Sequence, residues 1–256
     1  MRVKYIAIML TRPLCILIAQ IGLALLLGSW TAAFPWWPFQ MIAANIICFA
    51  ILRKLTSQDG EPFRNLYLRP FGSGLVAGKL GRWLGPRRFE RRALTVLRDV
   101  GLFAGFLLVL GLPAIAAARL IETQISTAME SWRYGPLPLW ALLAVTLLLP
   151  LTMPLVEVPW YFGYFFPKLE RLRVAAGKRH AWASALVITT AAYAVQHCFQ
   201  PFLFDARFLA LRAVMLLPLL LLTAVTLRAV PRFMPYVLVL HALMAVEVVW
   251  SYWRSA

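Results

Sequence analysis

The sequence predicts an all-α, multi-pass membrane protein of about seven spans. Three observations support this prediction. Of the 256 residues, 62% are hydrophobic and only 14% are charged, whereas soluble domains have roughly 45–50% apolar and about 25% charged residues. The apolar residues also gather in long runs, unlike the short alternating segments of a membrane β-barrel. We expect one integral membrane domain over residues 1–256.

The first expected span follows Arg12-Pro13, a step that interrupts the apolar run near the N-terminus. Basic residues precede this run, as in a signal peptide, but the remaining chain is equally apolar, so we interpret it as an uncleaved first span. The seven expected spans cover residues 13–30, 39–52, 100–118, 139–166, 182–204, 213–227 and 233–253.

The fourth expected span, residues 139–166, is longer than the about 20 residues that cross a bilayer. Three prolines, Pro150, Pro154 and Pro159, interrupt it. Proline removes a helical hydrogen bond and clashes with the preceding turn, so we expect a kinked or broken helix. Irregular backbone at membrane depth is tolerated where it is buried in protein or lines a cavity. We therefore expect an inward-opening polar cavity here.

The net charge of +16 points to the anionic inner membrane face rather than to nucleic acid, because the basic residues lie between apolar runs. Basic residues are concentrated in residues 53–98, 168–179 and 228–232. The positive-inside rule then places the N-terminus in the cytoplasm and the C-terminus outside. If the protein is bacterial, the expected location is the inner membrane, with membrane lipids as partners.

The longest polar segment, residues 53–98, is expected to be a basic cytoplasmic loop. Its part RRFERRALTVLRD alternates basic and apolar residues at helical spacing, which predicts a helix lying on the membrane surface. Either its charges orient the chain in the membrane, the interpretation we favour, or they capture a substrate. The three cysteines show no paired spacing, which argues against a disulfide framework and a cysteine-rich metal site: Cys15, Cys48 and Cys198.

Four polar groups able to do chemistry lie within the expected spans: Glu157, His197, His241 and Glu247. A charge at the bilayer centre costs about 2.5–3.5 kcal/mol, so Glu157 needs a reason to persist. Glu157 lies roughly 15 Å from the inner end of its span, at about 1.5 Å per residue. On the same scale His241 lies roughly 12 Å deep and His197 roughly 22 Å, or less if its helix begins near Ala185, so the three side chains can converge on one cavity. Glu247 falls on another face of its helix than His241.

Such a group suits water activation. A carboxylate in an apolar site can act as a general base, and a histidine can stabilise an oxyanion or shuttle protons. Two histidines and one glutamate also form a catalytic zinc set. The alternative is that Glu157, His197 and His241 are three separate polar residues, each hydrogen-bonded to a neighbouring helix, with no shared chemistry.

Three short patterns occur in order on three expected spans. Residues 154–169 read PLVEVPWYFGYFFPKL, with Glu157 followed by Phe162-Gly163-Tyr164. Tyr193 and His197 make the second pattern, and His241 with Ala245 the third. Together, over residues 139–250, they resemble the motifs of the CPBP family. This family contains the membrane-embedded type II CAAX prenyl endopeptidases and their bacteriocin-processing and abortive-infection relatives.

The resemblance implies that Glu157 activates water and that His197 and His241 serve the oxyanion side. Tyr193 and Tyr161 are expected to support them. The chain departs from the family pattern at three positions: Val158 replaces a Glu, Phe162 an Arg and Ala245 an Asn. The missing Glu and Arg are four residues apart on one helical turn, so in the family they can pair, and their joint loss leaves no orphan charge.

The leading hypothesis is therefore an intramembrane endopeptidase that hydrolyses a peptide bond of a peptide or protein substrate. Either it needs no metal, or Glu157, His197 and His241 bind one divalent metal such as zinc. The alternative is a catalytically impaired family member that acts as a membrane scaffold or protects the cell against its own secreted peptide. A proton-coupled transporter ranks last, because no second discontinuous helix occurs in a matching half.

Overall fold

The computed structural model describes residues 2–68, 92–122 and 135–255, and within these ranges the chain is helical with no strand. The helices are α1 (Arg2–Met9), α2 (Thr11–Leu27), η1 (Thr31–Trp36), α3 (Trp37–Gln58), α4 (Asn65–Leu68), α6 (Arg92–Phe106), η2 (Leu107–Gly111), α7 (Leu112–Glu122), α9 (Leu139–Val158), η3 (Pro159–Phe165), α10 (Phe166–Ala175), α11 (Ala181–His197), α12 (Ala206–Ala229), η4 (Pro231–Phe233) and α13 (Met234–Ser255).

The structure confirms an all-α protein whose helices indicate a multi-pass membrane protein. Within the described ranges, five helical runs are long and apolar enough to cross a membrane: Thr31–Gln58, Leu94–Ala117, Leu139–Ala175, Ala206–Ala229 and Pro231–Ser255. The bent pair α1–α2 makes a sixth if it is counted as one span. The count of seven is not confirmed, because the expected span 182–204 becomes α11, a helix of 17 residues that ends at His197.

The first expected span, residues 13–30, corresponds to α2 (Thr11–Leu27), which begins two residues earlier. Arg12 and Pro13 both lie inside the first turn of α2, where proline is tolerated because the first amide groups of a helix have no partner. Both side chains are buried. The interruption read from the sequence is instead a bend of 41° between α1 and α2.

The break expected in the fourth span is not found: α9 continues through Pro150 and Pro154, and the irregular part is a π-helix that begins at Pro159. Residues 139–175 form a continuous helical run in which η3 separates α9 from α10. Pro159 begins η3, directly after the helix that contains Glu157. π-helical turns often occur at functional sites. Here η3 lies in the core, with all seven of its residues buried.

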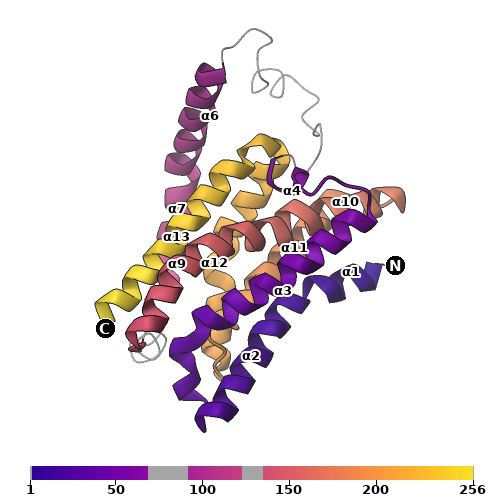
Figure 1. The fold of residues 1–256 in the computed structure, drawn as a ribbon. Helices are drawn as coiled ribbons and strands as arrows, with labels where there is room; N and C mark the ends of the chain where they lie inside the picture. Colours follow the sequence, from indigo (N-terminus) through magenta and orange to yellow (C-terminus); the bar gives the residue numbers. More distant parts are fainter. Residues whose placement is uncertain (1, 69–91, 123–134, 256) are drawn as a thin grey trace.

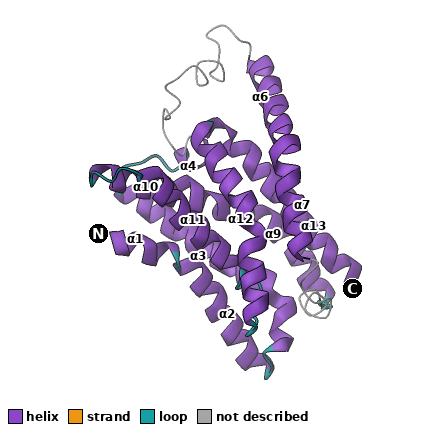
Figure 2. Cartoon of the chain, turned by 180° about the vertical axis from the view of Figure 1, so that it is seen from behind, coloured by secondary structure: helices purple, strands orange, loops and turns teal. Residues whose placement is uncertain are grey.

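α9 lies at the centre of the bundle and packs against α3 and α13 (Figure 1). Among the surrounding helices, α2 packs on α3, and α11 packs on α10 and α12. α7 packs on α12, whereas α6 projects away from the other helices in both views (Figures 1 and 2). α9 packs directly on α13, and α11 packs on η3, which continues α9, so the helices that carry the site residues come together here.

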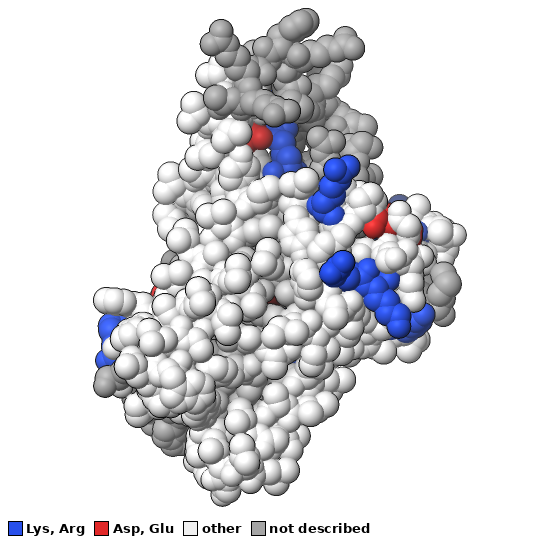
Figure 3. Space-filling model, viewed as in Figure 1, with Lys and Arg blue, Asp and Glu red and all other residues white. Residues whose placement is uncertain are grey.

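The basic segments predicted to share one face are joined by ion pairs. Lys168 binds Asp59 at 2.7 Å and Arg171 binds Glu61 at 2.6 Å. Further pairs join Arg228 to Glu170 and Arg232 to Asp99, both at 2.8 Å. Figure 3 shows Lys and Arg side chains gathered near α10 and α6, above a broad surface with almost no charge. Such a surface suits the apolar interior of a bilayer.

Much of the expected cytoplasmic loop, residues 69–91, lies outside the described residues, and so does the beginning of the expected interfacial helix. Residues 92–98 form the first turns of α6, which continues through η2 into α7. Gly101 and Gly105 on α6 are four residues apart, a spacing that can allow close helix packing. A Cβ placed on either glycine would meet nothing within 4 Å among the described residues, so the pair makes no close contact there.

Candidate functional site

Glu157, near the C-terminal end of α9, is the centre of a buried polar cluster. Its side chain is fully buried. Its Oε2 accepts a hydrogen bond from His241 Nε2 at 2.9 Å, and its Oε1 accepts one from the Arg12 guanidinium at 3.2 Å. Gln196 Nε2 also donates to Oε1. Both carboxylate oxygens are therefore satisfied, and a buried arginine balances the charge.

His197 approaches the same carboxylate from α11. Its Nε2 lies 3.7 Å from Glu157 Oε1. Its Nδ1 lies 2.9 Å from the main-chain oxygen of Tyr193, and because a carbonyl only accepts, Nδ1 carries the proton. In the neutral imidazole Nε2 then has a free lone pair, and this nitrogen is the ring atom that lies near the Glu157 carboxylate.

The structure thus brings together the three residues predicted from the sequence. Tyr193 and Tyr161, predicted to support them, lie beside them. The Tyr193 hydroxyl is 3.5 Å from His241 Nε2, and the rings of Tyr161 and Tyr193 stack with centroids 4.4 Å apart. Tyr161 is fully buried, and its hydroxyl has no hydrogen-bond partner within the described part of the chain.

Three members of the cluster were missed: Arg12, Asn45 and Gln196. Arg12 was interpreted as an interruption of the first span, and the two amides were not considered. Arg12 donates to Asn45 Oδ1 from Nε at 3.1 Å and from a terminal nitrogen at 2.8 Å. Asn45 in turn donates to Thr152 Oγ1 on α9 at 3.3 Å. The sequence offered only the general signal that a buried acid needs a cation; Arg12 adjoins an apolar run, but so does Arg53.

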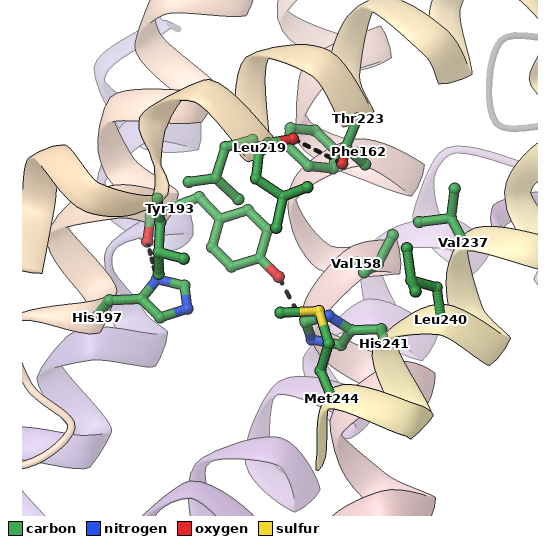
Figure 4. A pocket seen from close by; sticks show the side chains of 12 residues that line it. Val158, Phe162, Tyr193, His197, Leu219, Thr223, Val237, Leu240, His241 and Met244 are labelled. Atoms are coloured by element: carbon green, nitrogen blue, oxygen red, sulfur yellow. Dashed lines mark hydrogen bonds between the residues drawn. The ribbon is translucent and has the colours of Figure 1, made fainter. Parts of the chain in front are cut away.

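A small pocket with a volume of about 40 Å³ adjoins the cluster, room for a few water molecules. Figure 4 shows His197 and His241 on two sides of it, with the ring of Tyr193 between them and its hydroxyl directed toward His241. Glu157 is not part of the lining and lies behind the imidazoles. The other lining residues are Val158, Phe162, Leu216, Leu219, Leu220, Thr223, Val237, Leu240 and Met244.

The expected cavity was polar, and the pocket is polar on one wall only. Val158 and Phe162, the positions where the resembled family has charged residues, are buried at 2% and 0% exposure and form part of its apolar wall. Ala245 is fully buried in an apolar cluster with Met41 and Val249. The three departures therefore fit their surroundings as apolar side chains.

As arranged, Glu157, His197 and His241 do not fit a divalent metal. No group of three His, Cys, Asp or Glu side chains with a suitable arrangement occurs among the residues that the structure describes. The charge of Arg12 already compensates the carboxylate, and His241 directs Nε2 at Glu157, so this nitrogen donates a proton and offers no lone pair.

Glu247 is exposed on α13 and takes no part in the cluster, as its position relative to His241 predicted. Comparison of the chain with models of protein families, with curated proteins and with solved structures finds no match.

Proposed function

We propose that this protein is an intramembrane endopeptidase that activates water with Glu157. One observation carries the proposal: the carboxylate lies 2.9 Å from His241 and 3.7 Å from His197, and both imidazoles line a pocket. The order of the motifs that resemble those of the CPBP family supports the same reaction. The proposal includes α11 as a membrane-embedded element, which gives the expected seven spans, with the N-terminus in the cytoplasm.

In the proposed reaction a water molecule beside the Glu157 carboxylate and His197 Nε2 donates its hydrogens to these two acceptors. Its oxygen attacks the carbonyl carbon of the peptide as one proton passes to Glu157. The C–N bond then breaks, and the same proton leaves with the amine. The Tyr193 hydroxyl, which faces the pocket, stabilises the negative oxygen of the intermediate, and the Nε2 proton of His241 joins it once Glu157 is protonated and binds that proton less strongly.

The apolar wall sets the class of substrate in this proposal. A peptide does not fit in about 40 Å³. Substrate binding therefore requires α12 and α13, which supply most of the apolar lining, to move apart. The entering segment would be apolar around its scissile bond and would come from the membrane. A prenylated CAAX sequence is one such substrate, implied by the resemblance alone.

The test uses purified protein in liposomes with two kinds of quenched fluorescent peptides, apolar membrane segments and prenylated CAAX peptides. We expect cleavage by the wild type and a loss of roughly 10²–10⁴-fold in Glu157→Gln. Glu247→Gln, a carboxylate replacement at an exposed position of α13, is the matched control and should cleave normally. A chelator should have no effect. Equal cleavage by the wild type and Glu157→Gln would end the proposal.

The second candidate function is that of a non-catalytic membrane scaffold or self-immunity protein. It is favoured by the position of Glu157, which is fully buried behind the imidazoles and bonded to Arg12, Gln196 and His241. In cells that lack the gene, Glu157→Gln should then restore resistance to a secreted peptide as fully as the wild type does. Failure of this variant to complement, when it is present at wild-type level, would count against this function.

A further inference from the structure

Arg12 and Glu157 form an ion pair isolated from solvent. The two charged atoms lie 3.2 Å apart, and both side chains have 0% exposure. An arginine keeps its charge inside a protein, whereas a buried carboxyl group without a cation becomes protonated. Arg12 is also the one arginine or lysine bonded to this carboxylate among the described residues.

The guanidinium of Arg12 is held on two sides. Its Nε and one terminal nitrogen bond Asn45 on α3, and its other terminal nitrogen bonds Glu157. Asn45 is held by Thr152, on the same helix as Glu157. Planar groups with several donors lose little freedom when they are held in this way. The position of Arg12 therefore sets the position of Glu157 Oε1.

The bend between α1 and α2 brings Arg12 to this place. Pro13 has no amide hydrogen, so the carbonyl of Met9, four residues earlier, has no helical donor. The indole nitrogen of Trp160 donates to this carbonyl at 3.1 Å. Trp160 lies in η3, three residues after Glu157. The bend is thus attached to the α9–η3 run at two points, one through Trp160 and one through Arg12.

We propose that Arg12 is the counter-ion and positioning residue of Glu157. It keeps the carboxylate ionised and, through its bond to Oε1, holds the orientation in which Oε2 accepts from His241. The resembled family has an arginine at the position of Phe162 in η3. In this chain Arg12 supplies a cation from α2 instead. The effect on cleavage rests on the proposed function, but the effect on the ionisation of Glu157 does not.

The test is infrared difference spectroscopy on the purified full chain. In Arg12→Met we expect the carbonyl stretching band of a protonated carboxylic acid. The wild type should lack this band, and so should the double variant Arg12→Met, Glu157→Gln, which assigns the band to Glu157. Arg12→Lys keeps a charge and should also lack it. A folded Arg12→Met without the band would overturn the proposal.

The matched control is Arg212→Met. Arg212 on α12 is also a buried arginine, with 3% exposure, and it donates to the His197 carbonyl at 3.4 Å. Its loss should leave Glu157 ionised, so the same band in this variant would overturn the specific role of Arg12. If Arg12→Met fails to fold, the neutral double variant should restore folded protein, because it leaves no orphan charge. Failure of this rescue would count against the proposal.

The catalytic arm compares kcat and KM. Arg12→Lys cannot bond Asn45 and Glu157 together with the same geometry, so kcat should fall by about 10²-fold while KM stays unchanged. If the wild type cleaves and a folded Arg12→Met cleaves equally well, the positioning role is wrong. If the wild type cleaves nothing, the proposed function fails, and the infrared result still decides whether Arg12 is the counter-ion.

Discussion

Gly163 lies against the main-chain carbonyl of Leu66: a Cβ added at Gly163 would be 3.0 Å from this oxygen and 3.4 Å from Cβ of Pro159. Gly163 belongs to η3 and Leu66 to α4, so the contact packs the segment after α3 onto the π-helix. A main-chain oxygen cannot move aside as a flexible side chain can. Gly163 is therefore a packing glycine, whose missing Cβ allows the main chain of α4 to come close.

We expect Gly163→Ala to destabilise the protein by about 1–3 kcal/mol, the usual cost of overpacking. Gly101→Ala is the control, because a Cβ there meets nothing within 4 Å and alanine favours a helix by up to about 1 kcal/mol over glycine. Unfolding in mixed micelles measures both. Equal stability of the two variants would contradict this packing.

Asp205 caps α12. Its Oδ1 accepts a hydrogen bond at 2.7 Å from the amide of Phe208 in the first turn. We expect Asp205→Ala to lower the free energy of unfolding by about 0.5–2 kcal/mol and Asp205→Asn to preserve most of it, since Asn caps as well as Asp. The same unfolding assay measures these values. An equal loss with Asn and with Ala would show that the charge and not the cap stabilises this end.

Arg228 and Glu170 tie α12 to α10. The guanidinium donates to Glu170 Oε1 at 2.8 Å and 3.2 Å, and the two side chains are 23% and 9% exposed. A double-mutant cycle with Arg228→Met and Glu170→Gln should give a coupling free energy of about 1 kcal/mol.

The pair Arg171 and Glu61 is the control for this cycle. It is shorter, at 2.6 Å, but its side chains are 57% and 37% exposed. Water and salt screen exposed charges, so its coupling should be smaller and should vanish in high salt. A stronger coupling in the exposed pair would mean that distance and not burial decides the strength of these contacts.

The fold class and the three central residues were predictable because their signals are local. Apolar runs mark helices that cross a membrane, and an acid or a histidine inside such a run is costly enough to imply a partner. The order of Glu157, His197 and His241 on separate helices indicated convergence, and the contacts of His241 and His197 with Glu157 agree with it.

The counter-ion could not be predicted in the same way. Arg12 stands beside a proline at the end of a basic N-terminal stretch, where a charge normally faces the headgroups. Its burial depends on the 41° bend and on contacts with Glu157 and Asn45, which are far away in the sequence. Tertiary contacts of this kind leave no periodic pattern. The apolar character of the pocket likewise depends on residues of α12, which carry no motif.

Val158 and Phe162 offer the sharpest test of how the site accommodates its missing charges. Both line the apolar wall of the pocket at the junction of α9 and η3. Val158→Glu alone or Phe162→Arg alone buries a charge without a partner, and each should destabilise the protein by about 3–5 kcal/mol.

Introduced together, the two new side chains can pair across one helical turn. The double variant should therefore be more stable than the sum of the two single effects predicts, by at least about 1 kcal/mol. The matched pair Val158→Gln and Phe162→Met changes size with no charge and should be additive. Additive losses in the charged pair would show that Val158 and Phe162 do not face each other, because a buried Glu and Arg within reach of one another couple strongly.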